Sequence, residues 1–304
     1  MSSAVVTGAA RGFGLEIARR LVDRGHAVVL CDVDAEAVAA AASGLGSGAV
    51  GMGADVRDPE GLRRVAAAAV SLGPLDVWVN NAGVAPAGKA WEGKDEVVRA
   101  TVEVNLLGVI QGCRAAVDAM GARGGQILNV ASLAAHGPVP GLGVYAATKA
   151  GVVSFTLSLQ GDLNVAGLPI RTYVICPDAS NTRMVRDVVD EPDSALLFSG
   201  GALLDPGAVA DRAVAMLDGR RLVRTVPGWR SPVVRAGALT PSVGLKVLRV
   251  LRWWGDRRRP TVLTGKPQQA PPPPRPVAVL PNSSGKAQQD GAGGRPVEVS
   301  RHLR

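Results

Sequence analysis

Tyr145 and Lys149 stand four residues apart in the stretch VYAATKAGVV of a 304-residue chain that has two tyrosines. In a helix, residues at this spacing lie on the same face, so the two side chains can meet. A free phenol has a pKa near 10, and a nearby ammonium group stabilises its ionised form. The pair could therefore transfer a proton near neutral pH, although an ordinary amphipathic helix can show the same spacing.

A glycine-rich turn, TGAARGFG, follows the first apolar run of the chain and precedes a helical pattern. Glycines at positions 8, 12 and 14 let the backbone turn tightly and approach a pyrophosphate, to which the following helix offers free N–H groups. The position of the turn between a strand and a helix predicts a dinucleotide site. The turn alone does not decide this, because many strand-to-helix turns contain glycine.

Asp32 ends the second apolar run, where a carboxylate can accept hydrogen bonds from the adenosine ribose. Such a carboxylate would repel a 2′-phosphate and favours NAD, whereas Arg11 could pair with that phosphate and favours NADP. We expect NAD rather than NADP on balance. Asp32 could also be an ordinary helix N-cap.

Two more strand ends carry residues that could face a cofactor. Asp55 and Val56 end the third run, where a side chain could reach the adenine amino group. The sequence Asn80-Asn81-Ala82-Gly83 ends the fourth, and it could line the cofactor or form a plain turn.

The elements that must position these residues alternate along the chain. Apolar runs predict strands at 3–8, 26–32, 49–56, 75–83, 125–132, 170–177 and, more weakly, 221–228. Helical patterns fall at 12–24, 34–43, 59–72, 94–122, 145–166 and 206–218. Strands that are apolar throughout indicate a sheet covered on both faces. The chain is therefore predicted to be an α/β protein with a doubly wound parallel sheet, whose ligands lie at the carboxyl ends of the strands.

Charge divides the chain near residue 228. Residues 1–228 hold 20 Lys and Arg against 23 Asp and Glu, whereas residues 229–304 hold 14 against 3. We predict a catalytic domain at 1–228, a basic amphipathic extension at 229–259 and a Pro/Gly-rich, disordered tail at 260–304. The segment 240–259, with two tryptophans, could contact an anionic membrane surface, fold over the site or pack on another subunit. Nucleic-acid binding is not expected, because the basic residues form no recognisable module.

The three cysteines have no paired spacing, and Cys31 and Cys176 end apolar runs, a pattern typical of cytosolic proteins. We see no secretory signal and no apolar stretch of about 18 residues. We therefore expect a cytoplasmic protein, peripheral at a membrane if the basic segment binds one, and we expect no metal site.

The chain resembles the short-chain dehydrogenase/reductase family over about residues 3–228. The resemblance is carried, in order and in rough spacing, by TGAARGFG, Asp32, Asp55-Val56, NNAG, Asn105, Ser132 and Tyr145-x-x-x-Lys149. It implies a single-domain Rossmann fold that transfers a hydride between NAD(P) and an alcohol or carbonyl. It also implies a homodimer or homotetramer built on the helices at 94–122 and 145–166.

The resemblance assigns roles to four candidate catalytic residues. Tyr145 is the general acid/base, Lys149 supports it and holds the nicotinamide ribose, Ser132 binds the substrate oxygen, and Asn105 anchors a proton-relay water. Read alone, Ser132 would be a strand-end cap and Asn105 a local backbone hydrogen bonder. The predicted cofactor-binding residues are Gly8, Arg11, Gly12, Phe13, Gly14, Asp32, Asp55, Val56, Asn81, Ala82, Gly83, Tyr145, Lys149, Pro177 and Thr182.

One segment departs from the family pattern Pro-Gly-x-x-x-Thr, because Asp178 follows Pro177 where the glycine is usual. Thr182 could still contact the nicotinamide carboxamide. Asp178 could be a turn residue, order the following loop or contact the substrate. The segment 178–205 takes the place of the substrate-covering loop, and its apolar residues suggest either an apolar substrate or simple helix packing. His136 could line the mouth of the pocket or be solvated.

The sequence thus favours an NAD(P)-dependent alcohol dehydrogenase or carbonyl reductase that acts on a small-to-medium apolar molecule. The alternative is a catalytically silent nucleotide-binding or scaffold protein of the same fold. The presence of Ser132, Tyr145 and Lys149 together favours the enzyme.

Overall fold

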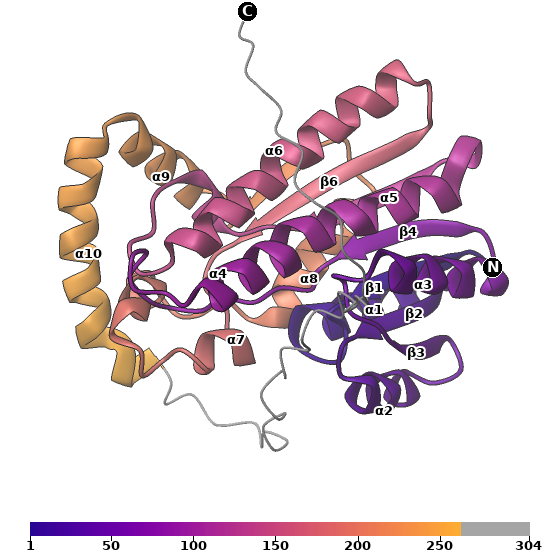
Figure 1. The fold of residues 1–304 in the computed structure, drawn as a ribbon, viewed down its shortest axis with the longest axis horizontal. Helices are drawn as coiled ribbons and strands as arrows, with labels where there is room; N and C mark the ends of the chain where they lie inside the picture. The colour runs from indigo at the N-terminus through magenta and orange to yellow at the C-terminus, as the bar shows by residue number, and fades with distance from the viewer. Residues whose placement is uncertain (263–304) are drawn as a thin grey trace, which may run out of the picture. The chain divides into compact units, whose positions relative to one another are not determined.

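The computed structural model describes residues 1–262, so most of the predicted tail, 260–304, lies outside the described residues. Seven parallel strands form one sheet in the order β3-β2-β1-β4-β5-β6-β7 (Figure 1). The strands are β1 (Ser3–Thr7), β2 (Ala27–Asp32), β3 (Ala49–Gly53), β4 (Leu75–Asn80), β5 (Gly125–Val130), β6 (Ile170–Pro177) and β7 (Val223–Val226).

Helices cover both faces of the sheet, as the apolar strands predict. One core lies under α1 (Gly12–Asp23), α2 (Ala35–Leu45) and α8 (Pro206–Val214), and the other under α3 (Pro59–Leu72), α5 (Gly108–Met120) and α6 (Gly143–Val165). Successive residues of β1 alternate between the two cores, with Ala4 and Val6 in the first and Val5 in the second. The doubly wound Rossmann-type fold is confirmed.

The strand order reverses beside β1, which pairs with β2 on one side and with β4 on the other. Chain segments that leave the carboxyl ends of β1 and β4 therefore diverge and open a crevice, the usual ligand position in such sheets. The glycine-rich turn follows β1 and the NNAG segment begins at the end of β4, so both meet at this crevice.

The predicted helix at 94–122 is three elements. A π-helical turn (Glu103–Leu107) separates α4 (Asp95–Val102) from α5, and a 3-10 turn, η2 (Gly121–Arg123), follows α5. Asn105, at the centre of the π-helical turn, is fully buried and bonds both backbone groups of Val84 at 2.8 Å. Single π-helical turns occur mostly at functional sites.

Several strands end earlier than predicted, because the last residues of each predicted strand leave the ladder and form loops. β3 ends at Gly53 rather than 56, and β4 ends at Asn80 rather than 83. The segment 178–205 contains α7 (Arg183–Arg186) and the 3-10 helix η4 (Pro192–Phe198), and η3 (Leu133–His136) follows Ser132. These departures are where the candidate site is built.

The basic extension folds onto the body as α9 (Arg230–Leu239) and α10 (Pro241–Val262). α9 packs on η3, and α10 packs on η4 (Figure 1). The approach of α10 is close, because a Cβ at Gly255 would lie 2.0 Å from the backbone oxygen of Ala195. Among the described residues, no helix has the length and hydropathy needed to cross a membrane.

Candidate active site

The glycine-rich turn presents bare backbone at the crevice. Gly8 and Gly12 have φ angles of +63° and +57°, a region that favours glycine. A Cβ at Gly14 would lie 2.3 Å from the Gly8 oxygen, so no side chain fits there. A Cβ at Gly12 would meet only Thr182, at 3.9 Å, so the turn faces open space there. This geometry fits a pyrophosphate, because the backbone can come close to it and the N-terminal end of α1 can offer free N–H groups.

The NNAG segment holds this turn in place. The Asn81 side chain donates to the Thr7 oxygen at 3.0 Å and to the Gly8 oxygen at 2.9 Å. The Thr7 hydroxyl accepts from the backbone N–H groups of Asn81 at 3.1 Å and of Ala82 at 3.2 Å. Asn81 thus fixes the turn through its side chain, and its contact with the cofactor stays a prediction.

Gly14→Ala is expected to abolish binding of NAD(H), because the new methyl group would displace the Gly8 carbonyl or the Asn81 amide. The measurement is a fluorescence titration with NADH, combined with thermal melting. Gly44→Ala, in α2 with nothing within 4 Å of the added Cβ, is the matched control. It should bind NADH normally and gain about 0.5–1 kcal/mol of stability. Normal NADH binding by Gly14→Ala would contradict the assignment.

Asp32 lies at the carboxyl end of β2, directly beside the turn. Its carboxylate accepts from the backbone N–H of Ala10 at 3.1 Å and from that of Asp34 at 3.2 Å. The N-cap of α2 is Asp34, which accepts from Ala37, so Asp32 is free of that role. Arg11 forms an ion pair with Asp34 at 3.5 Å.

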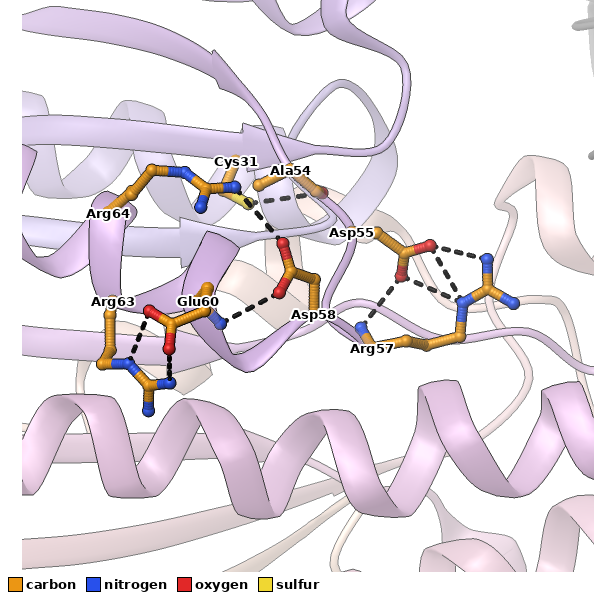
Figure 2. A network of polar contacts seen from close by, with 8 residues as sticks. All are labelled: Cys31, Ala54, Asp55, Arg57, Asp58, Glu60, Arg63 and Arg64. Carbon is orange, nitrogen blue, oxygen red and sulfur yellow. Dashed lines mark hydrogen bonds and ion pairs between the residues drawn. The ribbon is translucent and has the colours of Figure 1, made fainter. Parts of the chain in front are cut away.

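Asp55 begins a polar network after β3 (Figure 2). Its carboxylate accepts from the Arg57 guanidinium, with the shortest contact at 2.6 Å. Burial raises the pKa of Asp55, but the hydrogen bonds from Arg57 outweigh it and leave the pKa below its ordinary value. Val56 is buried and contacts the position of Gly108 in α5. The structure therefore places these two predicted residues in contacts within the protein.

Five predicted residues line one cavity of about 170 Å³: Phe13, Ser132, Tyr145, Pro177 and Thr182. Tyr145 lies in the first turn of α6, and Ser132 lies just beyond β5. The Ser132 hydroxyl accepts from Ala134 N–H at 3.2 Å and donates to the Pro177 oxygen at 3.4 Å. The rest of the wall is mostly apolar, including Leu142, Met184, Val185, Leu196, Leu197 and Val234.

Lys149 lies behind Tyr145, one turn further along α6. Its side chain is 3% exposed, and its Nζ donates to the Val130 oxygen at 2.8 Å. The Nζ lies 5.7 Å from the centre of the Tyr145 ring. A Cβ at Gly83 would lie 3.6 Å from this Nζ and 3.2 Å from the Asn105 Oδ1. Gly83 thus leaves room for Lys149 and Asn105 beside each other.

Burial controls the proton affinities of the pair. It raises the pKa of Tyr145 above its ordinary value, although the hydrogen bond with Ser132 opposes this. It lowers the pKa of Lys149 to about 8, because an ammonium is costly to bury. The sequence predicted a tyrosine pKa lowered by the lysine. In this structure burial is the largest influence on the Tyr145 hydroxyl, and it moves the pKa in the opposite direction.

A buried polar network below the pair was not predicted. Asn80 accepts from the Trp78 indole at 2.7 Å and donates to Asn129 at 2.9 Å. Asn129 donates in turn to Thr156 of α6, also at 2.9 Å. Because all four side chains are at most 3% exposed, this chain of bonds fixes α6 on the sheet. The only sequence signal was one asparagine in each of two apolar strands, Asn80 at the end of β4 and Asn129 in β5.

Asp178 pairs with Arg230, the first residue of α9, and its backbone N–H donates to the Val226 oxygen at 2.8 Å. The two charged side chains are only 20% and 17% exposed. Arg230, Leu248 and Leu251 also line the cavity, so the extension forms part of its wall. Folding of 240–259 over the site was one of the alternatives that the sequence left open, and Leu248 and Leu251 of α10 take that position. The role of Arg230 was not predicted, because Arg230 and Asp178 are 52 positions apart.

A larger groove of about 730 Å³ lies beside the cavity, and none of the four candidate catalytic residues lines it. Its wall includes Lys89, Trp91, Ala147 and Arg252. His136 lies on this wall, and its Nε2 contacts the Thr225 hydroxyl at 3.0 Å. His136 is therefore half-buried rather than solvated. No group of His, Cys, Asp and Glu in residues 1–262 is arranged to hold a metal ion.

The sheet, the glycine-rich turn at its switch point and the Tyr145–Lys149 pair beside it define a dinucleotide-binding α/β protein of Rossmann type. Residues 2–193 match the family model described as short chain dehydrogenase. The chain belongs to the short-chain dehydrogenase/reductase family, as its sequence motifs predicted.

Three comparisons illustrate this membership. A short chain dehydrogenase/reductase from Burkholderia phymatum, solved in complex with NAD, is 28% identical, with a TM-score of 0.71 and coverage of 77% of this chain and 92% of that one. A variant of the actinorhodin polyketide ketoreductase, solved with NADPH, is 32% identical, with a TM-score of 0.67 and coverage of 76% and 97%. A "Probable oxidoreductase EphD" of Mycobacterium tuberculosis is 36% identical over 187 residues, 59% of this chain. The chain spans only about 31% of the length of that relative.

Proposed function

We propose that this protein is an NAD(P)-dependent alcohol dehydrogenase or carbonyl reductase that acts on a small-to-medium apolar substrate. The observation that carries the proposal is the cavity in which Tyr145 and Ser132 meet a largely apolar wall, with Lys149 buried behind Tyr145. A hydroxyl or carbonyl group placed between the two side chains would find its hydrogen-bond partners there, while the apolar wall would hold the rest of the substrate.

Tyr145 is the proposed general acid/base. In the direction of carbonyl reduction its phenol donates a proton to the substrate oxygen, and in the direction of oxidation its phenolate accepts one. Because burial raises the pKa of Tyr145, the group is protonated at neutral pH and is ready to act as the acid. The Ser132 hydroxyl can hold the substrate oxygen and orient it towards the phenol.

Lys149 stabilises negative charge on Tyr145 when the proton leaves. Its ammonium is fixed by the Val130 carbonyl and has a pKa of about 8, so it is charged at neutral pH. Asn105 and Thr148 lie beside it, with the Asn105 amide 3.3 Å from the Thr148 hydroxyl. This polar group is a suitable route by which a proton could return to Tyr145.

The nicotinamide cofactor, when bound, would supply or accept the hydride. The bare turn at Gly8, Gly12 and Gly14 would hold its pyrophosphate, and Asp32 would hold its adenosine ribose. Thr182, which faces Gly12 and also lines the Tyr145 cavity, is placed to hold the nicotinamide end. Held by these residues, the cofactor would extend from the glycine-rich turn to the cavity that Tyr145 lines.

NAD is the preferred cofactor in this proposal. The Asp32 carboxylate lies beside the turn, and Arg11, the residue that could bind a 2′-phosphate, is already paired with Asp34. Close like charges repel by about 1–4 kcal/mol at a partly exposed site. Asp32→Asn should therefore raise the ratio of kcat/KM for NADP over NAD at least about fivefold.

The comparison is made with the same substrate at saturating concentration and both cofactors varied. Asp118→Asn, which removes an exposed carboxylate on α5, makes the same change of charge away from the turn. It should leave the ratio within about twofold of the original protein, below 0.5 kcal/mol. An unchanged ratio in Asp32→Asn would remove the argument for NAD.

The oligomer is proposed from apolar side chains that the helices expose. Helices α4 and α6 leave Val97 and Leu157 exposed, and the π-helical turn between α4 and α5 leaves Leu107 exposed. These are the segments that the family resemblance assigns to subunit contacts. We propose a homodimer or homotetramer through these helices, which light scattering can test.

The decisive experiment for the reaction is a panel of apolar and polar alcohols and ketones, assayed with NAD(H) and NADP(H) in parallel. The proposal expects turnover of apolar members that the cavity can hold. Tight NADH binding without turnover of any member would favour the catalytically silent alternative.

A further inference from the structure

Helix α10 carries two apolar stripes, of which the body covers only one. The covered stripe packs on α9, on η4 and on the cavity wall, and consists of Gly244, Leu248, Leu251 and Gly255. The second stripe has the same spacing, one residue earlier, and consists of Val243, Val247, Val250 and Trp254. Its members are 59%, 51%, 61% and 50% exposed. Such a periodic apolar stripe on an exposed face is unusual for a helix that packs on only one side.

A row of cationic and aromatic side chains runs along the other edge of the exposed stripe. Helical geometry places Lys246, Arg249, Trp253 and Arg257 on this neighbouring strip, and all four are exposed. The Arg257 guanidinium stacks on the Trp253 ring, 3.5 Å from its centre. Trp253 is 53% exposed, so both tryptophans of the helix keep about half of their surface in solvent.

We propose that this outer face of α10 binds the surface of an anionic lipid bilayer. A helix lying in the interfacial plane would place the valine stripe at the boundary of the acyl chains and its Lys and Arg residues among the headgroups. Tryptophan is enriched at that depth, because its ring is apolar and its N–H is polar. The pattern of α10 meets each of these requirements with residues that the body leaves exposed.

The charges favour a membrane over a second copy of this chain. Two copies packed through the same face would bring the rows containing Lys246, Arg249 and Arg257 close together, and juxtaposed like charges oppose association. The surrounding sequence, residues 229–304, holds 14 Lys and Arg against 3 Asp and Glu, so it supplies few acidic partners. An anionic surface provides the opposite charge along the whole row.

The position of the helix connects this surface to the active site, and this part of the inference rests on the proposed function. Leu248 and Leu251, on the covered stripe, line the same cavity as Tyr145. A helix with its side chains is about 10–12 Å across, so a bilayer bound to the outer face would lie close to the cavity wall. The enzyme would then draw its apolar substrates from those that partition into lipid.

The first test is co-sedimentation of the full-length protein with phosphatidylcholine vesicles, with and without phosphatidylglycerol, and needs no substrate. We expect binding only to the anionic vesicles and a strong loss of binding at high salt. The double variant Lys246→Gln with Arg249→Gln should bind the anionic vesicles about 30-fold more weakly. Each basic residue near the membrane surface contributes about 1 kcal/mol of binding free energy, and two are removed. Arg19→Gln with Arg212→Gln, two exposed positions on α1 and α8, is the control of equal charge and should bind normally. Equal binding by both double variants would overturn the proposal, because basic residues elsewhere would then account for it.

The second test asks whether the apolar face inserts. Vesicles with brominated acyl chains should quench part of the tryptophan fluorescence of the original protein. Trp253→Phe with Trp254→Phe should lose this quenching, whereas Trp91→Phe, at an 81% exposed tryptophan outside α10, should retain it. Unchanged quenching in the double variant would overturn the proposal. So would a result in which the protein binds no vesicles and the double variant changes only the oligomeric state. Absence of turnover with intact vesicle binding would count against the proposed reaction alone.

Discussion

Replacement of Tyr145 by phenylalanine should lower kcat by about a hundred- to ten-thousand-fold, the usual contribution of a positioned acid/base. The ring would remain in the first turn of α6 and would still line the cavity, so the change removes only the hydroxyl. The affinity for NADH should stay within about twofold, less than 0.5 kcal/mol, because the glycine-rich turn and Asp32 are untouched. Steady-state rates and an NADH titration measure both quantities on one preparation.

The other tyrosine provides a matched control. Tyr173 is 1% exposed in β6, and its hydroxyl donates to the Gly219 oxygen at 3.0 Å. Tyr173→Phe removes the same atom and should lower stability by about 0.5–1.5 kcal/mol, the net value of one hydrogen bond. Its kcat should be close to that of the original protein. Retained turnover in Tyr145→Phe, or an equal loss in both variants, would disprove the assignment of the acid/base.

The free energy of unfolding should increase as the pH rises above 8, because Lys149 is buried and releases its proton in the folded state. Its pKa is about 8 in the folded protein because of burial, against an ordinary value of 10.5. Between these values the folded state has released the proton while the unfolded state still binds it, so the free energy of unfolding increases with pH. At about 1.36 kcal/mol for each pH unit, the gain is about 3 kcal/mol across this window. Below pH 8 both states hold the proton, and this contribution no longer changes.

Urea unfolding of the original protein and of Lys149→Met at pH 7.5, 9 and 10.5 isolates this contribution. The difference in unfolding free energy between the two proteins should grow by about 3 kcal/mol in favour of the original, since other titrating groups cancel. Lys94→Met, at an exposed lysine before α4, should run parallel to the original protein. If the unfolding free energies of Lys149→Met and the original protein changed in parallel with pH, burial of the ammonium would carry no free-energy cost.

Local patterns in the sequence were sufficient for much of the site. Continuous apolar runs predict a covered parallel sheet, and the structure has one. The spacing of Tyr145 and Lys149 predicts two side chains on one helical face, and both lie on α6. In each case the signal spans only a few residues and follows directly from the period of a strand or a helix.

Interactions between distant segments were not predictable in the same way. The ion pair between Asp178 and Arg230 depends on how α9 returns to the sheet, which no short pattern encodes. The role of Asn81 depends on the position of the Gly8 carbonyl, supplied by another strand end. The proton affinity of Tyr145 depends on how much solvent the surrounding loops remove. These properties arise from tertiary contact rather than from spacing.

The ion pair between Asp178 and Arg230 also determines where this chain can be recombined with its relatives. One partner belongs to the loop after β6 and the other to the helix after β7, and both side chains are mostly buried. A hybrid joined near residue 228 would leave one of these charges without its partner and would exchange one wall of the cavity. Charges that lose a buried partner destabilise a protein strongly. Substrate range can therefore be transferred with the C-terminal helices only if both residues move together.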